Sequence, residues 1–197
     1  MAPADARGRE ASSLRYAGAG STLEQTEDGL VPNGDGWFVV NARDARWLHH
    51  DQLGSAVTFE GEKKFAELGI NIGVMQPGQP ACMYHGENAQ ENFVILSGEA
   101  VLVIEGEERQ LKQWDFVHCP PWVEHVIIAT GNEPCVVLSV GARPEGFGRE
   151  AEIVYPRNET AAAHSASAEF ETKLPKEAYA PYGRPARGRY RDGDLPG

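Results

Sequence analysis

Four side chains that can bind a metal ion lie in one part of the chain, among short apolar runs and tight turns. They are His85, Glu87, Glu91 and His125. His85 and Glu87 are two positions apart, so on an extended strand their side chains leave on the same face. Glu91 follows a short turn, and His125 comes just after the Pro120-Pro121 corner. Imidazole suits first-row transition ions, and carboxylate shifts the preference toward Mn and Fe(II).

The segments around these side chains predict an all-β protein. Roughly ten short strands are separated by turns rich in Gly, Pro, Asn and Asp, a pattern typical of an antiparallel barrel or sandwich. The first predicted strand is 37–40, and Asn41 is expected to cap a short helical turn that ends at Trp47. The adjacent residues His49 and His50 are interpreted as surface or loop histidines. One short helix is predicted over 159–167.

The spacing of the candidate ligands resembles the first conserved motif of the cupin superfamily, in its small single-domain form. That motif runs Gly, five residues, His-x-His, three or four residues, Glu, six residues, Gly. Here Gly78 is followed by six residues and then by His85, and Glu91 follows position 87 at the three-residue gap. Gly98 comes after six more residues. The departure is Glu87, which stands where the family has its second His.

The second cupin motif is similar to the segment that ends at His125. Asp115, Pro120 and His125 match it, while Trp114 and Trp122 stand in place of its glycines. The resemblance implies a jelly-roll barrel, the cupin double-stranded β-helix. It says much less about function, because one fold carries many chemistries.

The resemblance also implies a metal site. Carried over residue by residue, the family's ligand set gives His85, Glu91 and His125, with Glu87 in the remaining place if its side chain reaches. Mn or Fe is the expected ion, and Zn or Ni also suits such ligands. Glu87 has two alternative roles: it coordinates the ion, or it stands beside the ion as a catalytic general base with a raised pKa.

Strand alternation predicts which side chains line the pocket. If His85 and Glu91 face inward, then Met83, Phe93 and Ile95 should do so as well. His118 fits no motif position and is a further candidate for the pocket lining. An apolar wall with a few polar groups suits a small oxygenated molecule. We therefore expect a metal-dependent enzyme of the dioxygenase, isomerase or decarboxylase type, with a non-catalytic small-molecule-binding module as the alternative.

Length and composition suggest one domain with extensions. We expect a flexible arm at 1–20, the barrel at 21–142, and a C-terminal extension at 143–197 that packs on the barrel or on a partner subunit. A net charge of −11 argues against nucleic acid and anionic membranes as partners. Three scattered cysteines and the lack of a long apolar run favour a cytoplasmic location. A homodimer is expected, since two-fold pairing is the commonest assembly.

Overall fold

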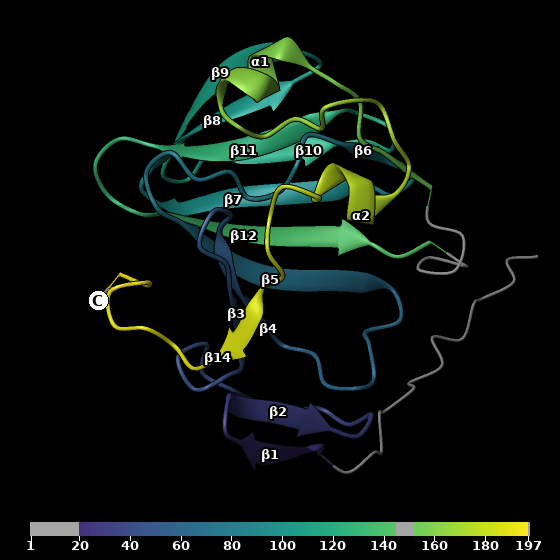
Figure 1. The fold of residues 1–197 in the computed structure, drawn as a ribbon. Coiled ribbons are helices and arrows are strands. Elements are labelled where there is room, and N and C mark those ends of the chain that lie inside the picture. Colours follow the sequence, from purple (N-terminus) through teal and green to yellow (C-terminus); the bar gives the residue numbers. More distant parts are fainter. Residues whose placement is uncertain (1–19, 145–151, 197) are drawn as a thin grey trace, which may run out of the picture.

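The computed structural model describes residues 20–144 and 152–196, so the predicted arm at 1–20 lies almost wholly outside the described residues (Figure 1). Within these ranges the chain is built mainly of strands. The strands are β1 (Thr22–Thr26), β2 (Gly29–Asn33), β3 (Trp47–His49), β4 (Ser55–Thr58), β5 (Leu68–Met75), β6 (Gly86–Glu87), β7 (Glu91–Ser97), β8 (Glu99–Ile104), β9 (Glu107–Lys112), β10 (Phe116–Cys119), β11 (His125–Thr130), β12 (Cys135–Ala142), β13 (Ile153–Val154) and β14 (Ala186–Gly188). The helices are α1 (Glu159–Ala163) and α2 (Pro175–Ala178).

Two antiparallel sheets form the walls of a barrel. One sheet has the order β10-β7-β12-β5-β4-β3-β14, and the other has the order β11-β8-β9, while β6 pairs with β13. Figure 1 shows β8, β9 and β11 in the upper part of the molecule, β7, β12 and β5 below them, and the β1–β2 hairpin at the bottom. Buried side chains from both walls form the core, among them Ile95, Leu102, Ile127 and Val137. The predicted all-β jelly-roll fold is confirmed.

Strand alternation explains which side chains enter the barrel. On β7, Phe93 and Ile95 are buried, and Glu91, two positions earlier, shares their face. On β10, Val117 and Cys119 are buried whereas Phe116 and His118 are exposed. The same face of β7 therefore places both Glu91 and the apolar core residues in the interior of the barrel.

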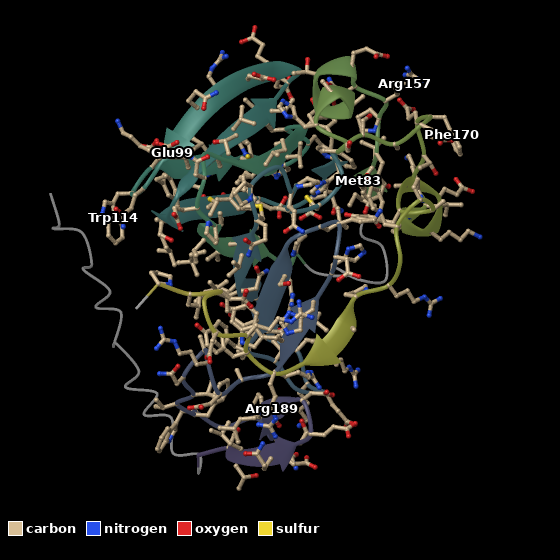
Figure 2. All side chains as sticks on the ribbon, turned by 60° about the vertical axis from the view of Figure 1, so that its left-hand side comes forward. Met83, Glu99, Trp114, Arg157, Phe170 and Arg189 are labelled. Atoms are coloured by element: carbon tan, nitrogen blue, oxygen red, sulfur yellow. The ribbon has the colours of Figure 1, made fainter. Side chains whose placement is uncertain are left out.

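Backbone conformation explains the glycines of the two motifs. Gly98 has φ 76°, and a Cβ there would lie 2.4 Å from the carbonyl oxygen of Pro134. Trp114 and Trp122, which replace motif glycines, keep φ values of 74° and 71°. An L-residue in this left-handed region costs roughly 1–2 kcal/mol. The chain therefore preserves the turn geometry of the motif at both positions without its glycines, and Trp114 projects from the periphery of the barrel (Figure 2).

The segment that precedes the barrel differs from the prediction. Residues 37–40 form no strand, and the preceding residues form the β1–β2 hairpin instead. Trp37 is 65% exposed and Val39 is 82% exposed, so these apolar side chains are not buried against a sheet. The expected helix at 41–47 is a single turn, in which the carbonyl of Asn41 accepts hydrogen bonds from Asp44 N and Ala45 N.

The C-terminal extension lies along the barrel in the described residues. Strand β13 pairs with β6, and β14 pairs with β3. Helix α1 begins at Glu159, as expected, with Asn158 as its cap, but it ends at Ala163 rather than at 167. Neither helix in the described ranges is long and apolar enough to cross a membrane.

An ion pair between buried Glu60 and half-buried Arg143 connects the strand wall to the segment that follows β12. Arg143 donates to both carboxylate oxygens of Glu60, at 2.5 and 2.9 Å, and to the carbonyl oxygen of Phe65 at 2.6 Å. Burial acts to raise the pKa of Glu60, but Arg143 outweighs it, and the net shift is downward. The carboxylate form is therefore favoured in the fold, and its contribution to stability is lost as the pH falls through the lowered pKa.

We expect Arg143→Met to lower the free energy of unfolding by about 2 kcal/mol, because the buried Glu60 carboxylate then keeps only the hydrogen bond from Phe65 N and the exposed Lys64. Chemical denaturation at neutral pH measures this effect, and it should shrink in acid. The matched control is Arg109→Met, which breaks the exposed Arg109–Glu107 pair and should cost less than ~1 kcal/mol. Equal losses of unfolding free energy in the two variants would show that the Glu60–Arg143 pair contributes no more to stability than the exposed Arg109–Glu107 pair.

Candidate metal centre

His85 and His125 are held side by side by the backbone. The two residues form an antiparallel bridge, in which His85 N donates to His125 O at 3.2 Å and His125 N donates to His85 O at 2.9 Å. Directly opposed residues of such a pair put their side chains on the same face. The ring centroids lie 5.1 Å apart, and both side chains are buried.

Backbone carbonyls also fix the orientation of the two imidazoles. Nδ1 of His85 lies 2.8 Å from the carbonyl oxygen of Met83, and Nδ1 of His125 lies 2.9 Å from that of Val123. A carbonyl only accepts, so each Nδ1 carries the proton and donates. Each Nε2 is then the ring nitrogen that points into the site and can bind an ion once it carries no proton, which is the arrangement in which metal-ligating histidines are usually held.

Glu91 reaches the two rings from the opposite wall. Its Oε2 lies 3.3 Å from Nε2 of His125 and 3.6 Å from Nε2 of His85. This oxygen is buried and accepts no hydrogen bond within the described residues. One ligand atom from each of the three residues lies within 4.8 Å of the others.

These donors fit a divalent transition ion. Two imidazole nitrogens and one carboxylate oxygen suit Mn, Fe or Zn, and three protein ligands leave further positions for water or substrate. Leaving a buried carboxylate oxygen without a partner is costly, and a cation between the three groups would remove that cost. With neutral imidazoles, the three ligands and a divalent ion carry a net charge of plus one.

The electrostatics couple the three groups in the absence of an ion. Burial acts to raise the pKa of Glu91, but His125 and His85 outweigh it and lower this pKa to about 2. Burial acts to lower the pKa of His125, but Cys119 and Glu91 raise it to about 10. For His85, burial is likewise outweighed by Cys82 and Glu91, and its pKa is raised. Protons therefore occupy the imidazoles at neutral pH and compete with a metal ion.

Glu87 lies outside the converging group. The cluster of potential ligand atoms contains His85, Glu91 and His125 but not Glu87. Glu87 is on β6, paired with Ile153, and is half-buried. Burial and the Glu91 carboxylate raise its pKa more than the two imidazoles lower it. It is thus close enough to feel the charges of the site, at a position where the family has a ligand.

A cavity of about 280 Å³ opens directly onto the three groups. At ~30 Å³ per water molecule, this volume holds roughly nine waters or one small organic molecule. Apolar side chains cover much of its wall, and Asn71 and Ser139, a cross-strand pair on β5 and β12, add polar groups. The cavity therefore combines an apolar lining with a few polar atoms and a charged inner end.

The central part of the chain matches a known family model. Residues 71–141 match the Cupin_2 family model, described as a cupin domain. This segment is a cupin domain. It belongs to the superfamily that the two motifs indicated. A comparison with curated proteins finds no match.

Several solved structures are similar to the cupin barrel. A candidate sugar phosphate isomerase from Acidithiobacillus ferrooxidans is 28% identical, with a TM-score of 0.39, over 45% of this chain and 54% of its own. The chain thus spans about half the length of that protein. The polyketide cyclase RemF from Streptomyces resistomycificus is 12% identical over 53% of this chain and 78% of its own, with a TM-score of 0.47. An RmlC-like cupin from Shewanella frigidimarina is 14% identical over 52% and 85%, with a TM-score of 0.43.

Only one of the four predicted pocket residues lines the cavity of the cupin barrel. Phe93 lines the cavity. Ile95 is fully buried one layer further along β7, in the core and not in the cavity wall. Met83 packs instead in a cluster with Tyr155, Ala168 and Ala178, the last residue of α2. His118 faces outward from β10 and pairs with Asn92 at 2.8 Å, because the alternation of that strand turns it away from the core.

Sequence reasoning missed the contribution of the C-terminal extension to the cavity. Tyr155 and Tyr179 line it, and their rings meet edge to face at 5.7 Å. The Tyr179 hydroxyl accepts a hydrogen bond from Met83 N at 3.2 Å. The aromatic residues of the tail were the available signal, but spacing along the chain gives no indication of which of them meets the barrel.

We expect metal binding to release protons, because the raised imidazole pKa values keep the two histidines protonated at neutral pH. Protons should leave as the ion binds at pH 7, and the apparent affinity should rise as the pH is raised, then level off above the His125 pKa of about 10. Calorimetry in buffers of different ionisation enthalpy counts the protons. Binding without proton release would contradict the protonation of the metal-free site.

Proposed function

We propose that the chain is a metal-dependent cupin enzyme that acts on a small oxygenated organic molecule. One observation supports this most directly. Two imidazole Nε2 atoms and an unsatisfied carboxylate oxygen converge at the inner end of a cavity that fits one small molecule. Such a cavity, with convergent polar groups and perturbed pKa values, is typical of an active site.

Each part of the site has a distinct role in this proposal. His85, Glu91 and His125 hold the ion, and Glu87 stands near them as the candidate proton acceptor. The ion would polarise an oxygen of the substrate or activate oxygen. Asn71 and Ser139 make no side-chain hydrogen bond within the described residues, so their polar atoms are available to orient a substrate. Tyr155 and Tyr179 line the cavity from the extension, where they would contact the substrate.

The residues support a class of reaction rather than a single one. Dioxygenase, isomerase and decarboxylase chemistry would each use an ion that binds an oxygen of the substrate, and His85, Glu91 and His125 would hold that ion. A non-catalytic small-molecule-binding module is the alternative. The homodimer expected from the sequence stays a prediction, and exposed Trp114 and Phe116 beside the free edge of β10 favour it.

We expect roughly one divalent ion per chain, bound mainly by the three converging groups. Glu91→Gln should weaken binding at least ~100-fold, because an anionic ligand is replaced by an amide. Glu87→Gln should change the affinity by no more than ~10-fold, since it alters only the surrounding charge. His118→Ala, on the outer face, is the control and should change nothing. Competition with a fluorescent chelator measures all four proteins; equal losses in the two Gln variants would make Glu87 a ligand.

We expect turnover once the protein is loaded with Fe(II) or Mn. Small 2-oxo acids, catechols and aldoses are the panel, oxygen uptake and mass spectrometry are the measurements, and Glu91→Gln is the inactive control. Glu87→Gln should lose activity ~10²–10⁴-fold while keeping its metal, if Glu87 transfers a proton. Thermal stabilisation by a compound without any product would favour the binding module over the enzyme.

A further inference from the structure

A second hollow adjoins the cavity at the metal centre. It is a groove of about 570 Å³ between the barrel and the C-terminal extension. Four residues line both spaces, namely Gly54, Ala56, Ala81 and Tyr179. Three of these residues are Gly or Ala, so the barrel side of the boundary between the two spaces carries only small side chains. Tyr179 lies on the extension side of this boundary.

Hydrogen bonds hold the walls of the groove in place. Nδ1 of His50 accepts from Gln52 N and Leu53 N, both at 3.1 Å, so the proton is on Nε2, which donates to Gly183 O at 2.8 Å. The Tyr182 hydroxyl donates to the carbonyl oxygen of Ser165 at 2.6 Å. Neutral His50 therefore connects the barrel to the extension through hydrogen bonds. The groove is formed without any ligand.

The charges that line the groove are of one sign. Lys176 and Arg184 are its charged lining residues, and no carboxylate is among the described residues that line it. Neither side chain takes part in a hydrogen bond or ion pair within the described part of the chain. The neighbouring Glu177 is turned away, since its carboxylate is hydrogen-bonded to the Thr172 hydroxyl. The chain has a net charge of −11, so two unpaired cations beside one groove contrast with the acidic composition of the chain as a whole.

We propose that this groove binds an anionic group at the far end of the substrate, so that the substrate is an elongated molecule with an oxygen donor at one end and a carboxylate or phosphate at the other. The inference rests on the proposed function, because the oxygen-donor end is placed at the metal centre. Lys176 and Arg184 attract and hold the anion, and the body of the molecule passes beside Tyr179 along the small residues Gly54, Ala56 and Ala81.

Two hydroxamates of equal chain length test this assignment on the Mn-loaded full-length protein. Octanohydroxamate ends in a methyl group and suberate monohydroxamate ends in a carboxylate; each has the same chelating head. We expect the carboxylate probe to bind about tenfold more tightly, and raised salt to reduce this preference. The corresponding ω-phosphonate shows which of the two anions the groove prefers. Calorimetry gives the dissociation constants.

Lys176→Gln/Arg184→Gln should abolish the preference while leaving the affinity for octanohydroxamate unchanged. The control Lys112→Gln/Lys173→Gln removes the same charge from exposed residues outside the groove and should keep the preference. Equal binding of the probes to the metal-loaded wild type overturns the anion site and leaves the metal centre intact. Binding of both probes without metal contradicts the proposed function, and the comparison of the two double variants still decides the groove.

Discussion

A buried carboxylate without a hydrogen-bond donor is the constraint that organises this protein. Glu91 enters the barrel from one wall, and its Oε2 lies between the Nε2 atoms of His85 and His125 from the other. A charged oxygen in such a place requires positive charge nearby, whether protons on the imidazoles or a metal ion. The lowered pKa of Glu91 and the raised pKa values of the histidines express the same requirement. Metal binding and protonation are thus two ways to satisfy one carboxylate.

The barrel meets this requirement through register and turn geometry. A slip of one residue on β7 would turn Glu91 outward and Asn92 inward, so the ligand depends on the same pairing that buries Phe93. On the other wall, the His85–His125 bridge requires the chain to turn sharply before β11. Trp122 makes this turn with φ 71°, and its N donates to the carbonyl oxygen of Glu87 at 2.7 Å. The strained backbone of the exposed Trp122 therefore supports the placement of the buried His85 and His125.

The sequence predicts the barrel and the convergence of three candidate ligands because local rules decide both. Period-two alternation marks the strands, and motif spacing marks His85, Glu91 and His125. The same rules fail where tertiary context decides. Met83 has the parity of a pocket residue, but the irregular chain between 80 and 86 and the approach of Tyr179 direct it to a different cluster. Segment 37–40 has the composition of a strand but no neighbouring strand with which to pair.

The division between barrel and extension has a chemical meaning. Barrel strands supply the charged inner end of the cavity, while Tyr155 and Tyr179 from the extension form part of its wall and Lys176 and Arg184 line the adjoining groove. A metal centre of two histidines and a carboxylate is compatible with many reactions, so the choice of substrate must come from residues that the cupin motifs do not contain. Under the proposed function, some of these residues, among them Tyr179, Lys176 and Arg184, belong to the extension, which lies beyond the part that matches the family. The metal-site candidates depend on sheet register, whereas the extension's part of the cavity wall depends on how the tail packs, and the two meet where the Tyr155 ring lies 5.9 Å from that of His85.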